Sequence, residues 1–235
     1  MRRVLLTTVL LLGALGLSAC ATPLDPGSTV TQERDVSGAS AVTLAGVGRL
    51  DVSIGPTASL EITAGERLMD RITSDVTDGM LVLDLRDGPN LGLGNIEYRL
   101  VLPNVESVTV SGAGDVEAKL DRAPSLGVLL AGAGDITVTG VDVKDLNVTV
   151  SGAGSVSLRG SAARQRVEIS GLGGYRGAEL ASVDAEVLVS GAGSASVSVT
   201  GTLDATVTGA GSITYSGSPE VTSTVTGVGS VRQAE

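Results

Sequence analysis

Hydrophobic and polar residues alternate with a period of two on both sides of a short glycine block that recurs along the second half of the chain. Before the first copy, Val108 and Val110 are apolar and Thr109 between them is polar. This alternation predicts a β-strand with one buried and one wetter face. A second alternating stretch begins at Val116, directly after the block. Each repeat therefore predicts strand, glycine corner, strand and second corner.

The glycine block reads Gly-Ala-Gly-Asp or Gly-Ala-Gly-Ser in most copies, and successive copies lie 18–20 residues apart. Its first glycines are Gly112, Gly132, Gly152, Gly171, Gly191, Gly209 and Gly227. A fixed period near 20 is typical of a solenoid, in which each repeat stacks on its neighbours. We therefore expect an all-β, single-domain parallel β-solenoid with about 18–20 residues per coil, and we favour a right-handed one.

The domain that the repeats predict spans residues 34–235. The regular Gly-Ala-Gly-Asp/Ser repeats occupy residues 106–231. Residues 34–105 hold further strand patterns and glycines at less regular intervals. Because the terminal coils of a solenoid are atypical, we expect this segment to form irregular, wider N-terminal coils. A small separate sheet is the alternative.

Two glycines in three residues predict a tight corner, because glycine accepts a positive φ and leaves room between coils stacked about 4.8 Å apart. The predicted corner glycines are Gly112, Gly114, Gly132, Gly134, Gly152, Gly154, Gly191, Gly193, Gly209 and Gly211. The fourth residue of the block, as at Asp115 and Ser155, is expected to cap backbone N–H groups. The second corner varies in length and sequence, which predicts an outward loop.

Residues 1–19 have the features of a lipoprotein signal peptide: Arg2 and Arg3, then an apolar run too short for a comfortable membrane span. The run ends in Leu-Ser-Ala-Cys at Cys20, which resembles the lipobox of bacterial lipoproteins. That resemblance implies cleavage before Cys20, the chain's only cysteine, and attachment of lipid to it. Residues 20–33 would then be a lipidated cysteine and a flexible tether. An ordinary signal peptide with an incidental cysteine is the alternative.

The composition narrows the class of protein. The chain has no Phe and no Trp, which fits thin stacked strands better than helices around a wide core. Its formal net charge of −10 argues against binding to nucleic acid or anionic headgroups. We expect partners to be a membrane, through lipid at Cys20, and a glycan or surface-protein ligand. The residue after Cys20 is alanine, and by resemblance to Gram-negative lipoproteins this favours the outer over the inner membrane.

Little in the sequence points to catalysis. There is no histidine and the one cysteine is assigned to lipid, which excludes His-based acid–base catalysis, cysteine nucleophiles and nearly all zinc sites. Asp115 and Asp135 would stack in adjacent coils and could bracket calcium, but turn capping is favoured because calcium needs six or more oxygens. Asp135, Arg159 and Arg176 are too scattered for a polysaccharide-cleaving site. We predict no catalytic, metal or cofactor residues.

Sugars bound by proteins usually stack on aromatic rings, so the three tyrosines are the candidates for glycan binding. Tyr175 and Tyr215 fall in columns that otherwise hold apolar residues, so packing in the core or at a corner is the favoured role. Tyr98 is the third aromatic residue.

The segment from Asp35 to the C-terminus resembles the head GIN domain family of auto-transporter adhesins, a domain of unknown function. The resemblance rests on Asp-Val-Ser-Gly at 35–38, Asp-Gly-Met-Leu-Val-Leu at 78–83, Leu-Pro-Asn-Val-Glu-Ser-Val at 102–108 and the serial Ser-Gly-Ala-Gly-Asp copies. It implies a β-solenoid of the bacterial cell envelope. The function predicted is that of a non-catalytic envelope lipoprotein, an adhesin or surface scaffold. The alternatives are a periplasm-facing glycan- or protein-binding or sensing module and, more weakly, a polysaccharide-active enzyme.

Overall fold

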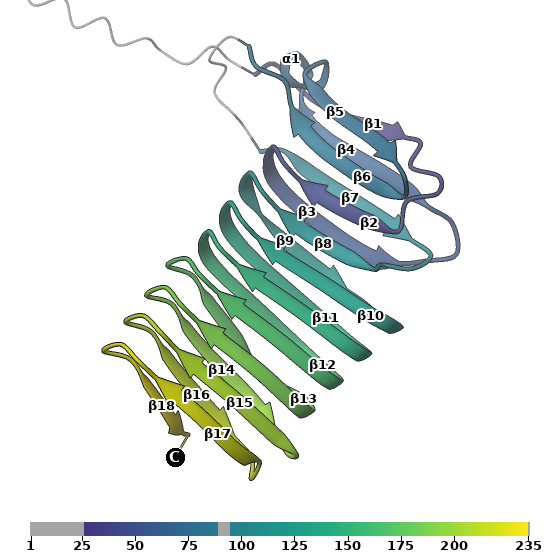
Figure 1. Cartoon of the computed structure of the whole chain (residues 1–235). Helices are drawn as coiled ribbons and strands as arrows, with labels where there is room; N and C mark the ends of the chain where they lie inside the picture. Colours follow the sequence, from purple (N-terminus) through teal and green to yellow (C-terminus); the bar gives the residue numbers. More distant parts are fainter. Residues whose placement is uncertain (1–25, 89–94, 235) are drawn as a thin grey trace, which may run out of the picture.

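In the computed structural model, which describes residues 26–88 and 95–234, the chain forms a parallel β-solenoid. Its coils stack along one axis, with the N-terminal elements at one end and the C-terminus at the other (Figure 1). The strands of the described residues join in one 18-stranded sheet that wraps around a continuous core. The predicted all-β, parallel solenoid is confirmed.

One ladder of strands, the first ladder, consists of the segments that lead into the glycine corners. Its members, in spatial order, are β6 (Met80–Leu85), β2 (Ala41–Leu44), β8 (Ser107–Val110), β10 (Arg122–Leu130), the C-terminal parts of β11 (Ala133–Val150), β12 (Ala153–Ile169) and β13 (Gly174–Val189), β15 (Thr202–Val207) and β17 (Glu220–Val225). Val128, Val148 and Val167 lie in register and are buried. The period-two alternation thus places one apolar column after another in the core.

The second ladder consists of the segments that leave the corners. Its members are β7 (Glu97–Leu102), β3 (Val47–Ile54), β9 (Ala113–Lys119), the N-terminal parts of β11, β12 and β13, β14 (Ser194–Val199), β16 (Ser212–Ser216) and β18 (Ser230–Gln233). Ile136, Val156 and Tyr175 lie in register here and are buried. The core is the space between these two ladders.

The second corner differs from the prediction in the middle coils. Residues 141–143, 160–162 and 180–182 of β11, β12 and β13 stay extended and pair in a third, short ladder. The predicted outward loop is therefore wrong for these coils. The chain turns there through irregularities in the strand register and through Gly140 and Gly160, which have φ of 76° and 138°.

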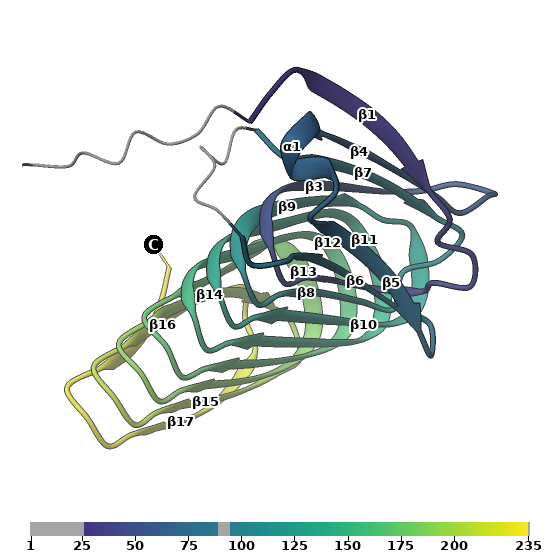
Figure 2. The same cartoon turned by 90° about the horizontal axis from the view of Figure 1, so that it is seen from above.

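The N-terminal segment forms coils, but in an order that differs from the sequence. β2 pairs with both β6 and β8, and β3 pairs with both β7 and β9, so the coil of β6 and β7 lies outside the coil of β2 and β3. The end is closed by an antiparallel arrangement that the sequence did not predict: β4 (Ser59–Gly65), β1 (Thr29–Arg34) and β5 (Ile72–Thr77), together with the short helix α1 (Glu66–Met69). Leu68 and Met69 of α1 are buried. Figure 2 shows these elements over the end of the stack.

Cys20 and the predicted signal peptide lie outside the described residues. Within residues 26–88 and 95–234, no helix has the length and apolar character of a membrane span.

Candidate binding surface

The glycine corners are packed directly on one another. The backbone N–H of Ala133 donates to the carbonyl of Gly112 at 2.9 Å, and that of Ala153 donates to the carbonyl of Gly132 at 3.0 Å. At each of the ten predicted corner glycines, an added Cβ would overlap a carbonyl oxygen of the neighbouring coil. Among these ten, φ is positive at Gly134 and Gly154. Crowding between coils, more than positive φ, therefore accounts for glycine at this corner.

The fourth residue of the block caps the next coil. Oδ1 of Asp115 accepts the backbone N–H of Asp135 at 2.9 Å, and Oδ1 of Asp135 accepts that of Ser155 at 2.8 Å. These carboxylates therefore satisfy backbone donors along the stack. No group of three or more His, Cys, Asp or Glu side chains in the described part of the chain is placed to hold a metal ion.

The residues considered for polysaccharide cleavage do not converge. Arg159 pairs with Glu179 at 3.2 Å, and Asp135 is engaged in capping. Arg176 is in register with Ser157, two coils away from the coil of Asp135.

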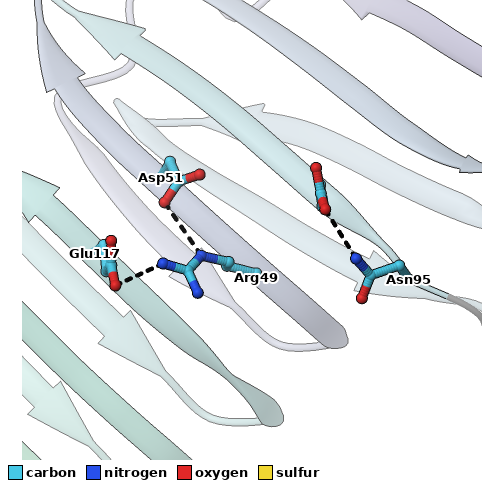
Figure 3. A network of polar contacts seen from close by, with 5 residues as sticks. Arg49, Asp51, Asn95 and Glu117 are labelled. Atoms are coloured by element: carbon cyan, nitrogen blue, oxygen red, sulfur yellow. Dashed lines mark hydrogen bonds and ion pairs between the residues drawn. The ribbon is translucent and has the colours of Figure 1, made fainter.

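Arginine–carboxylate pairs join neighbouring coils over much of the surface. Figure 3 shows Arg49 of β3 between Asp51, 3.5 Å away, and Glu117 of β9, 2.5 Å away. The hydrogen bond with Glu117 raises the pKa of Arg49 above its ordinary value. These side chains are exposed, so the pairs add little to stability. They do match opposite charges across hydrogen-bonded strands, which favours the native register.

Two such pairs line a shallow groove on the outer face of the first ladder. The groove has a volume of about 720 Å³ and runs across β11, β12, β13, β15 and β17. We call it the charged groove, defined by Arg164, Arg166, Asp184, Glu186, Asp204 and Glu220. Arg164 pairs with Asp145 at 2.8 Å and Arg166 with Glu186 at 2.5 Å. Each coil thus contributes one or two polar side chains to an open surface.

A second groove lies over the third ladder, on the other side of the second corner from the charged groove. It has a volume of about 670 Å³ and is lined mainly by small apolar side chains, and we call it the apolar groove. These are Ala123, Pro124, Val143, Ala162, Ala163, Ala181 and Val183. Val183 is 51% exposed.

A buried polar network holds the corner between the two grooves. The hydroxyl of Tyr175 donates to Oε1 of Gln165 at 3.0 Å, and Nε2 of Gln165 donates to Oγ of Ser182 at 2.6 Å. Oγ of Ser182 donates to the carbonyl of Ser198 at 2.9 Å. Gln165 lines the charged groove and Ser182 the apolar groove, so the network ties the two walls together. Burial raises the pKa of Tyr175 well above its usual value.

Sequence reasoning missed this network, although a signal was present. Gln165 occupies a column that holds Leu146, Ala185 and Leu203 in neighbouring coils. A polar residue in an apolar column is therefore the sign of a buried hydrogen-bond network. The predicted packing roles of the tyrosines are confirmed: Tyr175 is buried and Tyr215 packs half-buried against the core. No aromatic ring of the described residues lines either groove.

Several solved structures have this fold. A "putative adhesin" from Bacteroides fragilis NCTC 9343 superposes with a TM-score of 0.86 at 23% identity, covering 90% of this chain and 100% of its own. A "putative lipid binding protein" from Parabacteroides distasonis ATCC 8503 gives 0.71 at 20% identity, with 89% and 98% covered. A "putative adhesin" from the same organism gives 0.70 at 18% identity, with 91% and 100% covered. Comparison with curated proteins gives no match.

The sequence itself identifies the family. A family model matches residues 40–219, which include β4, β5 and α1 of the closed N-terminal end, the glycine corners up to Gly211, the apolar groove, and the charged groove apart from β17. The family and the structural neighbours named adhesins are not described as enzymes, and an adhesin family indicates a protein of the cell surface or envelope. The chain belongs to the family described as "Putative auto-transporter adhesin, head GIN domain".

Proposed function

We propose that the chain is a non-catalytic adhesin of the bacterial cell envelope, anchored through lipid at Cys20, which presents the solenoid as a rod with a binding surface spread over successive coils. The charged groove is the observation that carries this proposal. It is open, it crosses five strands of the first ladder, and its polar side chains come from consecutive coils. Such a surface suits an extended glycan or protein segment better than a small substrate.

The spacing of the coils supports an extended ligand. Strands in a ladder repeat about every 4.8 Å, so equivalent positions present polar side chains at regular intervals. Each contact alone is weak, and several together give avidity. The arginines of the groove are 65–70% exposed and paired with carboxylates. Exposed ion pairs add little stability, so the same arginines can exchange their carboxylate partners for the hydroxyl groups of a ligand.

The anchor is supported by the sequence of residues 1–20, and the direction of the rod by the fold. The closing elements lie at one end of the solenoid and the C-terminus at the other (Figure 1). Pro26 lies beside these elements, because its carbonyl accepts the backbone N–H of Arg67 in α1. A lipid at Cys20 would therefore hold the closed end near the membrane and direct the remaining coils away from it.

The test is binding of the full, detergent-solubilised chain to an array of immobilised glycans and extracellular-matrix proteins. Arg166→Glu removes a groove ion pair, and Arg99→Glu removes a comparably exposed pair with Glu61 outside the groove. We expect retention on at least one probe, weakened severalfold by Arg166→Glu and unaffected by Arg99→Glu. No retention on any probe, or equal loss in both variants, would overturn the proposal. Protease treatment of intact cells checks the orientation, because a periplasm-facing module resists digestion.

A further inference from the structure

The core-facing side chains of the last coil are not covered by another coil of the described residues. Val221 and Val225 of β17 lie in register with Leu203 and Val207 of β15. Leu203 and Val207 are 1% and 0% exposed, whereas Val221 and Val225 are 37% and 43% exposed. The side chains of β17 therefore continue apolar columns of the core, but they face out of the end of the stack.

The two ends of the solenoid differ in this respect. At the N-terminal end, antiparallel β1, β4 and β5 and the helix α1 cover the core. At the other end, β17 pairs with β15 and β18 pairs with β16, and no strand of the described residues pairs with their outer edges. Two free edges, each with unpaired N–H and C=O groups, thus flank an exposed apolar strip. Such an edge is a template for another strand.

We propose that this end is a self-association surface, at which two copies of the chain join end to end around a twofold axis through the corner at residues 227–229. A partner that pairs with both free edges must supply two strand edges set at the same angle to each other as β17 and β18. The same end of a second copy supplies two such edges at that angle. Because β17 runs toward the corner and β18 away from it, the twofold axis places β18 of one copy antiparallel to β17 of the other. An interface of this kind is isologous, with the same surface contributed by both copies.

The sequence of the last coil fits this pairing. Counting outward from Val228, Val225 of one copy lies opposite Val231 of the other, and both are core-facing positions. Thr224 lies opposite Arg232, and both face outward. No two like charges oppose each other. The apolar faces of the two copies therefore meet inside, and the polar faces remain in water.

Charge also favours a second copy at this end. The chain as a whole carries −10, and this acidity opposes contact between copies over most of its surface. In residues 218–235 the charged side chains are Glu220, Arg232 and Glu235, a net charge of −1. The open end is therefore a nearly neutral part of an acidic molecule.

The joined rods have a functional consequence, which rests on the proposed lipid anchor and adhesive role. End-to-end association leaves the closed N-terminal ends at opposite extremes of the dimer. Copies anchored at Cys20 in two facing membranes would then meet through their distal ends, which makes the contact a homophilic one between cells.

Sedimentation of the full chain in detergent over a range of concentrations tests the association. Val225→Lys places a charge in the apolar strip, and Val183→Lys makes the same change at an exposed valine of β13, two coils before β17 and outside the strip. We expect the unaltered chain and Val183→Lys to dimerise alike, and Val225→Lys to raise the dimer dissociation constant by about tenfold or more. A monomeric unaltered chain, or identical behaviour of both variants, would overturn the proposal.

The register is tested by cysteine pairing in chains that carry Cys20→Ser. Under mild oxidation, a mixture of Val225→Cys and Val231→Cys chains should form a covalent dimer that neither variant forms alone. A dimer from either variant alone, or none from the mixture, contradicts the pairing of β17 with β18. Neither experiment involves an anchored chain or a glycan, so their outcomes are independent of the test of the proposed function.

Discussion

The hydroxyl of Tyr175 donates a hydrogen bond of 3.0 Å to Oε1 of Gln165, and both side chains are almost completely buried between the two grooves. Gln165 in turn donates to Ser182, so each polar atom of the network has a partner. Among the described residues, no buried side-chain nitrogen or oxygen lacks a hydrogen bond. Loss of one partner would therefore leave an uncompensated polar group in the core.

Tyr175→Phe should lower the free energy of unfolding by about 1–3 kcal/mol, because Oε1 of Gln165 then stays buried without its donor. Urea unfolding measures the change. Tyr215→Phe is the matched control, since Tyr215 is half-buried and lies outside the network, and it should change stability by less than about 0.5 kcal/mol. Equal losses in the two variants would contradict the role of the network.

Stability should fall at alkaline pH. Burial, with a smaller contribution from Asp84, raises the pKa of Tyr98 to about 12, and burial raises that of Tyr175 further. The fold thus favours the neutral phenols: stability is complete below the unfolded pKa near 10 and is lost as pH rises toward and through the folded values. Between the unfolded and folded pKa values, each buried tyrosine should lower the free energy of unfolding by roughly 1.4 kcal/mol per pH unit.

Urea unfolding from about pH 9 to about pH 12 checks this dependence. The loss should be smaller in Tyr175→Phe, which has one buried phenol fewer. A stability that stays level above pH 10, or the same slope in both proteins, would show that burial of the tyrosines does not control it.

The corner glycines should differ sharply from other glycines in their tolerance of a methyl group. At Gly154, φ is 136° and a Cβ would overlap the carbonyl oxygen of Gly134. At Gly127 the nearest atom to an added Cβ is 3.4 Å away, an ordinary contact. Gly154→Ala should cost more than about 2 kcal/mol and Gly127→Ala less than about 0.5 kcal/mol. Thermal unfolding compares them, and similar melting temperatures would refute the steric explanation.

Membrane attachment should depend on the thiol of Cys20. Cys20→Ser should give an uncleaved or soluble chain, because the lipobox then lacks its lipid acceptor. Fractionation and intact-mass measurement check this. A variant that keeps the mature, lipidated mass and sediments with membranes would exclude the anchor.

The sequence predicts the solenoid because its two strongest signals are local and repeated. Alternation around Val108 and Val110 specifies a strand, and the period of the glycine blocks specifies stacking. The closed end could not be predicted in this way, since β4 and β5 have ordinary strand patterns whose antiparallel pairing is decided by long-range contacts. Leu68 and Met69, which cover the core through α1, lie in too short a segment to show a helical period.

The binding surface is less visible in the sequence. The outward residues of the charged groove differ from coil to coil, so Arg164 and Arg166 look like scattered surface charges until the register brings them beside Asp145 and Glu186. The second corner was misread because its variable sequence resembles a loop. Its extended backbone depends on pairing with residues about 20 positions away.

The central claim, a binding surface distributed over the coils, is tested most directly by removing one coil. Deletion of residues 132–151 joins Ala131 to Gly152, keeps the corner sequence and leaves the Tyr175 network intact. We expect the shortened rod to fold, which circular dichroism checks. Surface plasmon resonance on the glycan or protein probe that retains the unaltered chain should then show severalfold weaker binding. Binding that vanishes or stays unchanged in the folded deletion variant would contradict a distributed surface.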